Sequence, residues 1–334
     1  MYFGIDELKK LIREEFKNKI NNYQFDNVFH MTDDEDEYYE LEPIIEEYKI
    51  FKNKRDNGRL IIPNELFKPR KKRYGTRNIY EYNKWFFKET RTNSYEDYTE
   101  LFSEEIFKYF GINNTFYDLA ILNDKKGVIS YDFTNGNEYI NGKDIISEII
   151  NSDDIKEIVK YNNINSLRYI IEEYAKKHKL KINIENIIKK LEKIILIDML
   201  LLQNDRNPNN YGFIIDNNEL VLARIFDNSN AISSNHIDRN PINSFPLLTI
   251  DENTYTSFYD EIENNKDFYR ELLDYINEIE DKLDDFFTMI ENKIESPLPE
   301  EYKLFVKENL KKHFNNIKEI YKEKTLVLNK KSIN

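Results

Sequence analysis

The feature that most constrains the fold is a polar loop between a long apolar helix and a predicted hairpin. Residues 204–213 read Asn-Asp-Arg-Asn-Pro-Asn-Asn-Tyr-Gly-Phe, and Asp205 and Asn210 stand five positions apart in this loop. Upstream, apolar residues recur at i, i+3, i+4 and i+7, which predicts an amphipathic helix largely buried against its neighbours. This stripe consists of Ile184, Ile187, Ile188, Leu191, Ile194, Ile195, Met199 and Leu202. The loop is therefore expected to begin where a core helix ends.

Downstream of the loop, two apolar runs predict β-strands joined in a hairpin. The runs cover residues 211–215 and 220–226, and the Asp216-Asn217-Asn218 segment between them has the composition of a turn. Asp227 follows the second run directly. The predicted order is thus helix, polar loop, hairpin and Asp227. A structural alternative stays open, in which the loop's Asp and Asn residues only cap a helix and form turns.

Asp205, Asn210 and Asp227 are side chains of the kind that phosphoryl transfer requires of a protein. The reaction needs an acceptor hydroxyl aimed at the γ-phosphate and Mg2+ ions that bridge the phosphates. In protein kinases a catalytic-loop Asp accepts the hydroxyl proton, an Asn five positions later binds one Mg2+, and a further Asp binds Mg2+ as well. We therefore predict Asp205 as the catalytic residue and Asn210 and Asp227 as metal ligands.

A kinase site also needs a cation on the phosphates, usually a strand Lys held by a helix Glu. Lys88 and Glu100 are the predicted pair. Lys84 shares a strand face with Lys88 and competes with it for this role. Glu105 interrupts the apolar stripe of its helix and competes with Glu100.

A turn at Gly75 and Thr76 is the candidate source of backbone N–H donors to phosphate. The turn contains a single Gly and is flanked by Arg and Lys residues, which departs from a G-x-G-x-x-G loop. This departure indicates either a nucleotide flap in which basic side chains replace close backbone contacts, or weak or absent ATP binding.

The segments before the loop predict a β-rich region followed by helices. A strand is expected over residues 79–88, then a helix from residue 93 that ends at Gly111. Two more strands, 116–122 and 127–133, are separated by a turn at 123–126. Helices are then expected over residues 143–151, 152–161, 165–179 and 184–203, and again beyond about residue 253.

Together these segments predict an α+β fold of the bilobal protein kinase-like type, with a small β-rich N-lobe carrying one helix and a larger, mostly helical C-lobe. The expected divisions are 1–62 for a helical and acidic N-terminal extension, 63–140 for the N-lobe and 141–334 for the C-lobe. Within the extension, residues 5–20 predict an amphipathic helix and the like-charge run 33–37 predicts a solvated loop.

Net charge, the lack of Cys and the lack of long apolar stretches disfavour several classes of function. The net charge of −13 opposes nonspecific binding to nucleic acid or to an anionic membrane. No Cys occurs, which excludes disulfides, thiolate metal sites and cysteine nucleophiles. No apolar stretch approaches the length of a membrane span, and the first residues run directly into charged ones, so neither a span nor a signal peptide is expected. A cytoplasmic protein is the default.

The Asn-Asp-Arg-x-x-x-Asn-Tyr-Gly-Phe loop, the hairpin and the following Ile-Phe-Asp-Asn-Ser resemble the HipA-like serine/threonine kinases, including the cell-translocating kinase branch found in bacteria. The resemblance covers about residues 85 to 235. It implies a catalytic Asp205 and metal-binding Asn210 and Asp227. Asn207 stands where the family commonly has His.

The resemblance extends upstream of the loop. The family has an acidic residue eleven positions before a Gly-Ile or Gly-Leu pair, and Glu100 stands eleven positions before Gly111, which favours Glu100 over Glu105. Lys88 resembles the phosphate-contacting Lys. The Ser130-Tyr131-Asp132-Phe133 segment resembles the hinge whose backbone would meet adenine, so Tyr131, Asp132 and Phe133 are candidate nucleotide-binding residues.

The resemblance implies phosphorylation of Ser or Thr on a protein substrate, dependent on ATP and Mg2+ and often accompanied by autophosphorylation. Thr76, Thr90, Thr92 and Ser94 are candidate sites because they lie near the predicted flap. Toxin, effector or phage-defence settings are implied too, so a partner or antitoxin protein is expected, with delivery into another cell if the chain is an effector.

Two other functions stay open. The first is a phosphotransferase for a small molecule or lipid, since the loop also resembles lipid and antibiotic kinases. The second is a pseudokinase that binds a partner protein through its acidic surface and N-terminal extension. A nucleic-acid-binding module is less favoured because residues 70–73 form the one dense basic run in the sequence.

Overall fold

The structure is a computed structural model that describes residues 54–70, 77–134, 136–233, 245–252 and 256–331. The chain divides into two compact units, Met1–Arg55 and Asp56–Asn334. The predicted helix at 5–20 and the acidic run at 33–37 lie outside the described residues, and the account below concerns the second unit.

The first sheet has seven strands among the described residues, in the order β1-β2-β6-β7-β5-β4-β3. β6 pairs with β2 in parallel and with β7 in antiparallel fashion. The strands are β1 (Arg55–Asp56), β2 (Arg59–Ile61), β3 (Lys68–Pro69), β4 (Ile79–Tyr82), β5 (Trp85–Glu89), β6 (Tyr117–Leu122) and β7 (Lys125–Tyr131). Since β2 precedes residue 63, the sheet takes in residues that the sequence assigned to the extension, and the expected domain boundaries stay predictions.

The expected single strand over residues 79–88 is wrong, because this segment is the hairpin β4–β5. The chain reverses at Asn83 and Lys84, and Asn83 has a φ of 51°, a left-handed conformation that Asn adopts more readily than most residues. The aromatic residues that indicated one strand are shared between two paired strands, with the rings of Tyr80 and Phe87 6.0 Å apart. Continuous β-type composition therefore concealed the turn.

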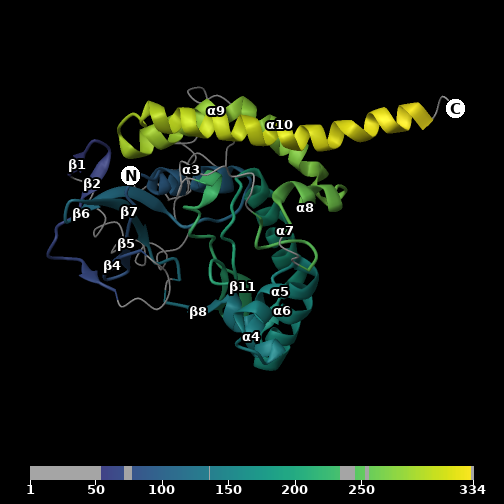
Figure 1. The fold of residues 1–334 in the computed structure, drawn as a ribbon. Coiled ribbons are helices and arrows are strands. Elements are labelled where there is room, and N and C mark those ends of the chain that lie inside the picture. Colours follow the sequence, from purple (N-terminus) through teal and green to yellow (C-terminus); the bar gives the residue numbers. More distant parts are fainter. Residues whose placement is uncertain (1–53, 71–76, 135, 234–244, 253–255, 332–334) are drawn as a thin grey trace, which may run out of the picture. The chain divides into compact units, whose positions relative to one another are not determined.

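The turns and helix ends differ from the expectations by a few residues. The β6–β7 turn needs two residues, Asn123 and Asp124, both with positive φ, where four were expected. The helix expected from residue 93 is α3 (Glu96–Tyr109), which packs on β6 and β7 and, on another side, against α9 (Leu272–Ile294) (Figure 1). α3 is thus held between the sheet and the C-terminal helices.

The second sheet has the order β8-β10-β11-β9 and contains the expected hairpin as β10–β11. Asn217 and Asn218 form its turn, with φ values of 47° and 63°, as the primed two-residue hairpin turns require. β11 ends at Leu222, four residues before the expected end of the strand. The strands are β8 (Glu138–Asn141), β9 (Lys181–Ile182), β10 (Gly212–Asp216) and β11 (Glu219–Leu222).

The rest of the described chain is mainly helical, and α7 lies at the centre of the core. The expected stripe on α7 is confirmed, because its apolar residues from Ile187 to Leu200 are almost completely buried. α9 and α10 run side by side (Figure 1). The remaining helices are α4 (Gly142–Ile150), α5 (Ile155–Lys160), α6 (Ile164–His178), α7 (Ile184–Leu200), α8 (Phe258–Asn264), α10 (Glu300–Lys331) and the short 3-10 helices η1 (Ala231–Ser233) and η3 (Phe268–Glu271).

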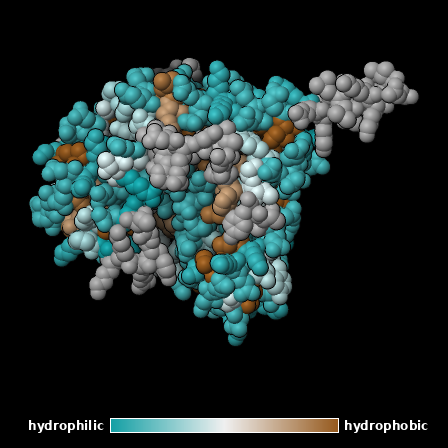
Figure 2. Space-filling model, in the orientation of Figure 1, coloured by the Kyte–Doolittle hydropathy of each residue, from teal (hydrophilic) through white to brown (hydrophobic). Residues whose placement is uncertain are grey.

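The fold therefore combines a β-rich sheet region with a helical C-terminal part. The face in Figure 2 is mostly hydrophilic, with hydrophobic residues in small separate patches. Among the described helices, none has the length and apolar character needed to cross a membrane.

Candidate active site

The polar loop begins directly after α7, and its own amides orient Asp205. Asn207 donates its Nδ2 hydrogen to Asp205 Oδ1 at 2.8 Å, and Asn230 donates to Asp205 Oδ2 at 2.8 Å. The Asn207 side-chain oxygen accepts from the backbone N–H of Asn209, which fixes the Asn207 amide. Asn210 Nδ2 donates to the Asp205 backbone carbonyl at 2.6 Å. Amide donors thus hold both carboxylate oxygens of Asp205. One of these donors is Asn207, at the position where the HipA-like kinases commonly have His.

Arg206 lies beneath the loop with only 1% of its surface exposed. Its guanidinium forms a two-point ion pair with Asp198 of α7, through N–O distances of 2.9 Å and 2.9 Å. It also donates to the backbone carbonyls of Asn210 and Phe226 and to Asn228 Oδ1. Arg206 therefore joins α7, the loop and the segment around Asp227 in one hydrogen-bonded unit.

Sequence reasoning missed Arg206 and Asp198 as organising residues. The usable signal was Asp198 itself, an acidic residue inside an otherwise apolar helical run, since a buried carboxylate needs a charged or hydrogen-bonding partner. Arg206 stands eight positions later in a loop whose composition indicates exposure, so the sequence alone did not connect the two.

Lys88 on β5 connects two acidic residues from distant parts of the chain. Its Nζ lies 3.0 Å from Glu100 Oε1 on α3, and it also donates to Asp227 Oδ1. The other Glu100 oxygen accepts the Asn228 backbone N–H at 2.9 Å. The structure thus brings three of the predicted site residues into direct contact, and Glu100 is anchored from both sides.

The two competing residues lie elsewhere. Lys84 is in the exposed β4–β5 turn, and its backbone carbonyl accepts from the Asp132 N–H. Glu105 pairs with Lys108 on its own helix, with N and O 3.3 Å apart. The geometry therefore places Glu100 at Lys88, and neither competitor takes part in that contact.

Burial and neighbouring charges shift the pKa values of Glu100, Asp205 and Asp227 in different directions. Burial raises the pKa of Glu100, and Lys88 offsets part of this rise. Burial also raises the pKa of Asp205, and the nearby charge of Asp227 raises it further. Burial opposes ionisation of Asp227 too, but the charges of Lys88 and Arg77 outweigh it and hold its pKa below the usual range. Asp227 is thus a stable anion suited to a cation, while Asp205 is a stronger base than an ordinary Asp.

The backbone at Asp227 is constrained. Its φ is 57°, in the left-handed region that Asp tolerates better than most residues. Its backbone N–H donates to the Tyr117 hydroxyl oxygen at 3.1 Å, and Gln203 Nε2 donates to its carbonyl at 3.3 Å. These contacts from β6 and from the end of α7 keep the carboxylate beside Lys88.

The three hinge candidates follow one another at the end of β7. Tyr131 is the last residue of the strand, and the Asp132 side chain accepts the Thr134 backbone N–H at 3.0 Å. Phe133 stacks on Phe226 with ring centroids 5.7 Å apart, next to the Asp227 segment. The hinge segment is therefore packed against the site, while the flap candidates at positions 75 and 76 lie outside the described residues.

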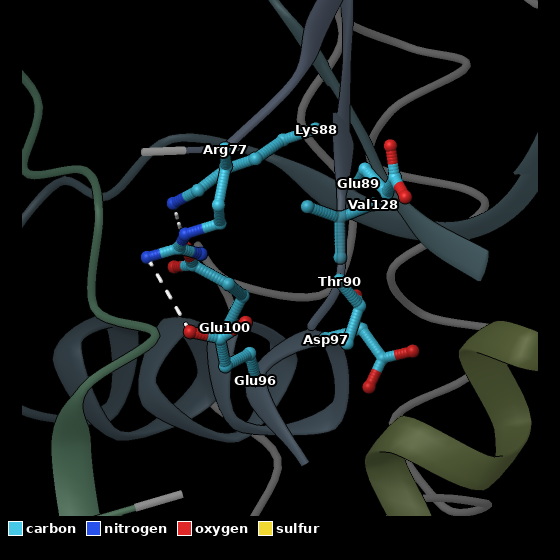
Figure 3. A pocket seen from close by; sticks show the side chains of 8 residues that line it. All are labelled: Arg77, Lys88, Glu89, Thr90, Glu96, Asp97, Glu100 and Val128. Atoms are coloured by element: carbon cyan, nitrogen blue, oxygen red, sulfur yellow. Dashed lines mark hydrogen bonds and ion pairs between the residues drawn. The ribbon is translucent and has the colours of Figure 1, made fainter. Parts of the chain in front are cut away.

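A shallow, nearly filled recess lies between β5 and α3 (Figure 3). In this view Lys88 and Arg77 extend toward Glu100 and Glu96 of α3. The side chains leave almost no enclosed space in the recess, so they must move before it can hold any part of a nucleotide.

The expected metal ligands offer the right kind of donor. No cluster of three or more His, Cys, Asp or Glu able to hold a metal occurs within the described residues. Mg2+ does not need such a cluster, since it is commonly bound through one or two carboxylates together with substrate phosphates and water. With its Nδ2 engaged by the Asp205 carbonyl, Asn210 has its amide oxygen to offer, and Asp227 is ionised. This donor set fits a hard cation shared with phosphates.

Solved structures that resemble this one include the following two. The proinflammatory kinase CtkA of Helicobacter pylori is 21% identical, with a TM-score of 0.55 over 76% of this chain and 92% of that chain. HipA of Shewanella oneidensis MR-1, solved with HipB and operator DNA, is 12% identical, with a TM-score of 0.50 over 93% of this chain and 82% of that chain. No protein-family model and no curated protein matches the sequence.

At these identities the likeness establishes the fold. Both neighbours are HipA-like kinases, so the resemblance noted in the loop and the hairpin extends to the arrangement of the elements. The chain has the fold seen in these HipA-like kinases.

Proposed function

We propose that this protein is a serine/threonine protein kinase of the HipA-like type that uses ATP and Mg2+. The observation that carries the proposal is the contact of Lys88 with both Glu100 and Asp227, three residues from β5, α3 and the segment after the hairpin. A buried Lys–Glu pair beside an ionised Asp is the arrangement that positions phosphates and metal in kinases. The kinase-like fold supports the same reading.

Each site residue then has a role. Asn210 and Asp227 hold Mg2+, Lys88 contacts the phosphates, and bound Mg2+ neutralises charge on them. Asp205 accepts the proton of the acceptor hydroxyl, and its raised pKa suits a general base better than that of an exposed Asp. The side-chain amides of Asn207 and Asn230 donate to its two carboxylate oxygens and so hold the carboxylate in one orientation.

The remaining predicted residues complete the nucleotide site in this proposal. The backbone of Tyr131, Asp132 and Phe133 meets adenine, and the flap at residues 75 and 76 covers the phosphates. The β-rich region at 63–140 and the helical region at 141–334 act as the two lobes of a bilobal kinase, preceded by the extension at 1–62.

A partner protein is part of the proposal. HipA of Shewanella oneidensis was solved together with HipB in a toxin–antitoxin system. By analogy, this chain would work with a regulatory or antitoxin partner in addition to its protein substrate. A cytoplasmic location fits such a partner, and delivery into another cell would follow if the chain acts as an effector.

Labelling with γ-32P-ATP tests the proposal. Purified protein is incubated with Mg2+ and labelled ATP, alone and with candidate acceptors, beside an Asp205→Asn variant and an EDTA-treated sample. Label on Ser or Thr of the chain or of an added protein, absent from both controls, supports a protein kinase. Label on a small molecule or lipid only would select the alternative phosphotransferase. Absence of Mg2+ and ATP binding in calorimetry would select a pseudokinase.

Phosphopeptide mapping of the labelled chain locates any autophosphorylation. The proposed positions are Thr76, Thr90, Thr92 and Ser94. The last three lie on the segment between β5 and α3. Ser94 donates its hydroxyl hydrogen to the Arg91 carbonyl at 2.9 Å, so its phosphorylation would break a local turn contact.

A further inference from the structure

Arg77 is a second cation beside Lys88 in the candidate site. Its Nη2 donates to Ser229 Oγ at 2.6 Å and lies 3.5 Å from Asp227 Oδ1. The same nitrogen lies 3.6 Å from Glu96 Oε1. The side chain is 12% exposed, so its charge acts in a partly desolvated setting where electrostatic contacts are strong. The sequence singled out no residue for such a role, and indicated only that basic side chains flank the predicted turn at Gly75.

The acids around Arg77 have other cationic partners. Glu96 accepts the Arg91 backbone N–H at 3.0 Å and lies 3.1 Å from Arg91 Nη1. Asp227 is bonded by Lys88. Neither acid therefore depends on Arg77 alone for neutralisation, which leaves the Arg77 charge available for a ligand.

Metal binding would change the balance of charges around the Asp227 carboxylate. Lys88 and Arg77 both face the same oxygen, Asp227 Oδ1, which also accepts from the Ser229 hydroxyl. A carboxylate oxygen that coordinates Mg2+ cannot keep two cationic neighbours at contact distance, because all three carry positive charge. Occupation of Asp227 by Mg2+ would thus release Arg77, while Glu96 keeps its guanidinium near the site.

We propose that Arg77 is a second phosphate-binding residue, which leaves Asp227 when Mg2+ binds and then contacts the phosphate chain of ATP. The inference rests on the proposed function and adds a substrate-binding residue to it. A guanidinium presents paired N–H donors that match phosphate oxygens. Arg77, two residues before β4, and Lys88 of β5 both line this recess, so both can reach one ligand (Figure 3).

The role also accounts for the Gly-poor turn. Close backbone N–H contacts to phosphate need small residues, and the sequence of the predicted turn before Arg77 has a single Gly. A charged side chain placed directly after that turn supplies phosphate affinity without such contacts.

The test compares phosphate-dependent binding in Arg77→Gln, Arg77→Lys and wild type. Isothermal titration with Mg2+-ATP and with AMP gives the ATP-to-AMP affinity ratio of each protein. Arg70→Gln is the matched control, because Arg70 pairs with Glu81 in the same sheet region but has 49% of its side chain exposed. Circular dichroism and thermal unfolding verify that each variant is folded.

We expect Arg77→Gln to lower ATP affinity by roughly tenfold or more, the loss of one hydrogen bond to a charged group, and to leave AMP affinity unchanged. Arg77→Lys should recover part of the ratio, and Arg70→Gln should keep all of it. An unchanged ratio in Arg77→Gln, whether both affinities stay constant or fall together, overturns the phosphate role and leaves the kinase proposal standing. A wild-type protein that binds no ATP overturns both.

Discussion

Arg206 and Asp198 form a two-point ion pair beneath the loop that carries Asp205, with both N–O distances at 2.9 Å. Both side chains are almost completely buried. Burial raises the pKa of Asp198, and the adjacent guanidinium offsets part of this rise. Burial opposes the charge of Arg206, but the Asp198 carboxylate outweighs it and raises the Arg206 pKa. The loop is therefore fixed from below by an interaction that the core helix itself provides.

Removing one partner of this pair should strongly destabilise the fold. Asp198→Asn leaves the Arg206 charge buried, and the expected loss is about 3 to 5 kcal/mol in the free energy of unfolding measured with urea. Adding Arg206→Met should restore part of the loss, because the unpaired charge is gone. Glu185→Gln, which breaks the exposed Arg168–Glu185 pair, is the control and should have little effect. Equal, small losses in all variants would contradict a structural role for the pair.

Glu100 and Glu105 provide a matched test of the Lys88 contact. Both lie on α3 and both are buried, but only Glu100 reaches Lys88. Glu100→Gln should reduce phosphoryl transfer on the order of 100-fold, since small displacements of a phosphate-positioning group have effects of this size. Glu105→Gln should retain most of the activity. Equal rates in the two variants, measured under saturating ATP, would show that the Lys88–Glu100 contact is not used.

His313 on α10 should make stability depend on pH. Its Nε2–H donates to the Met199 carbonyl at 2.7 Å, and Nδ1 accepts from the Tyr259 hydroxyl at 3.0 Å, which fixes the neutral ring. Burial lowers its pKa from 6.5 to about 4. Below pH 6.5 the unfolded chain binds the proton and the folded chain does not, so stability falls as pH drops toward 4.

The loss attributable to His313 between pH 7 and pH 5 is about 2 kcal/mol, from roughly 1.4 kcal/mol per pKa unit. Urea unfolding at both pH values, in wild type and His313→Gln, measures it. The variant should lose less stability than wild type over this interval. The same decrease in both proteins would assign the pH dependence to other groups.

Lys293 on α9 should help to hold α3 in place. It lies 2.8 Å from Glu104 Oε2, and Glu104 is fully buried, with Lys108 as its other cationic partner. Lys293→Met should weaken this anchor and raise hydrogen exchange at α3 amides. Lys318→Met removes the pair between Lys318 of α10 and Glu280 of α9, which does not involve α3, and should leave α3 exchange unchanged. Unaltered α3 protection in Lys293→Met would show that apolar packing alone fixes the helix.

The elements that the sequence could predict are long or strongly periodic. α7 has an apolar repeat over five turns, and the β10–β11 hairpin has two apolar runs around an Asn-rich turn, so local pattern and final structure agree. β8 and β9 have only four and two residues, which is too short for a period to register. β2 pairs with β6, about sixty residues downstream, and no local sequence pattern indicates so distant a pairing partner.

Site residues that belong to a motif of fixed spacing could be predicted from the sequence. Residues that reach the site through contacts between distant parts of the chain could not. Asp205, Asn210 and Asp227 were identified by their positions relative to the helix and hairpin, and Glu100 by its offset from Gly111. Arg206 received no role from the sequence, because its burial depends on Asp198 of the core helix. Arg77 belongs to no recognisable sequence motif, and only the folded chain brings it to Asp227.

Single-turnover phosphoryl transfer by Asp205→Asn tests the central claim most directly. The variant keeps the size of the side chain and removes its capacity to accept a proton, so Mg2+-ATP affinity should match wild type. With ATP bound, transfer to the acceptor hydroxyl should be at least about 100-fold slower, the range of general-base contributions. Transfer at the wild-type rate from an Asp205→Asn protein with wild-type ATP affinity would contradict the assignment of Asp205 and the kinase mechanism built on it.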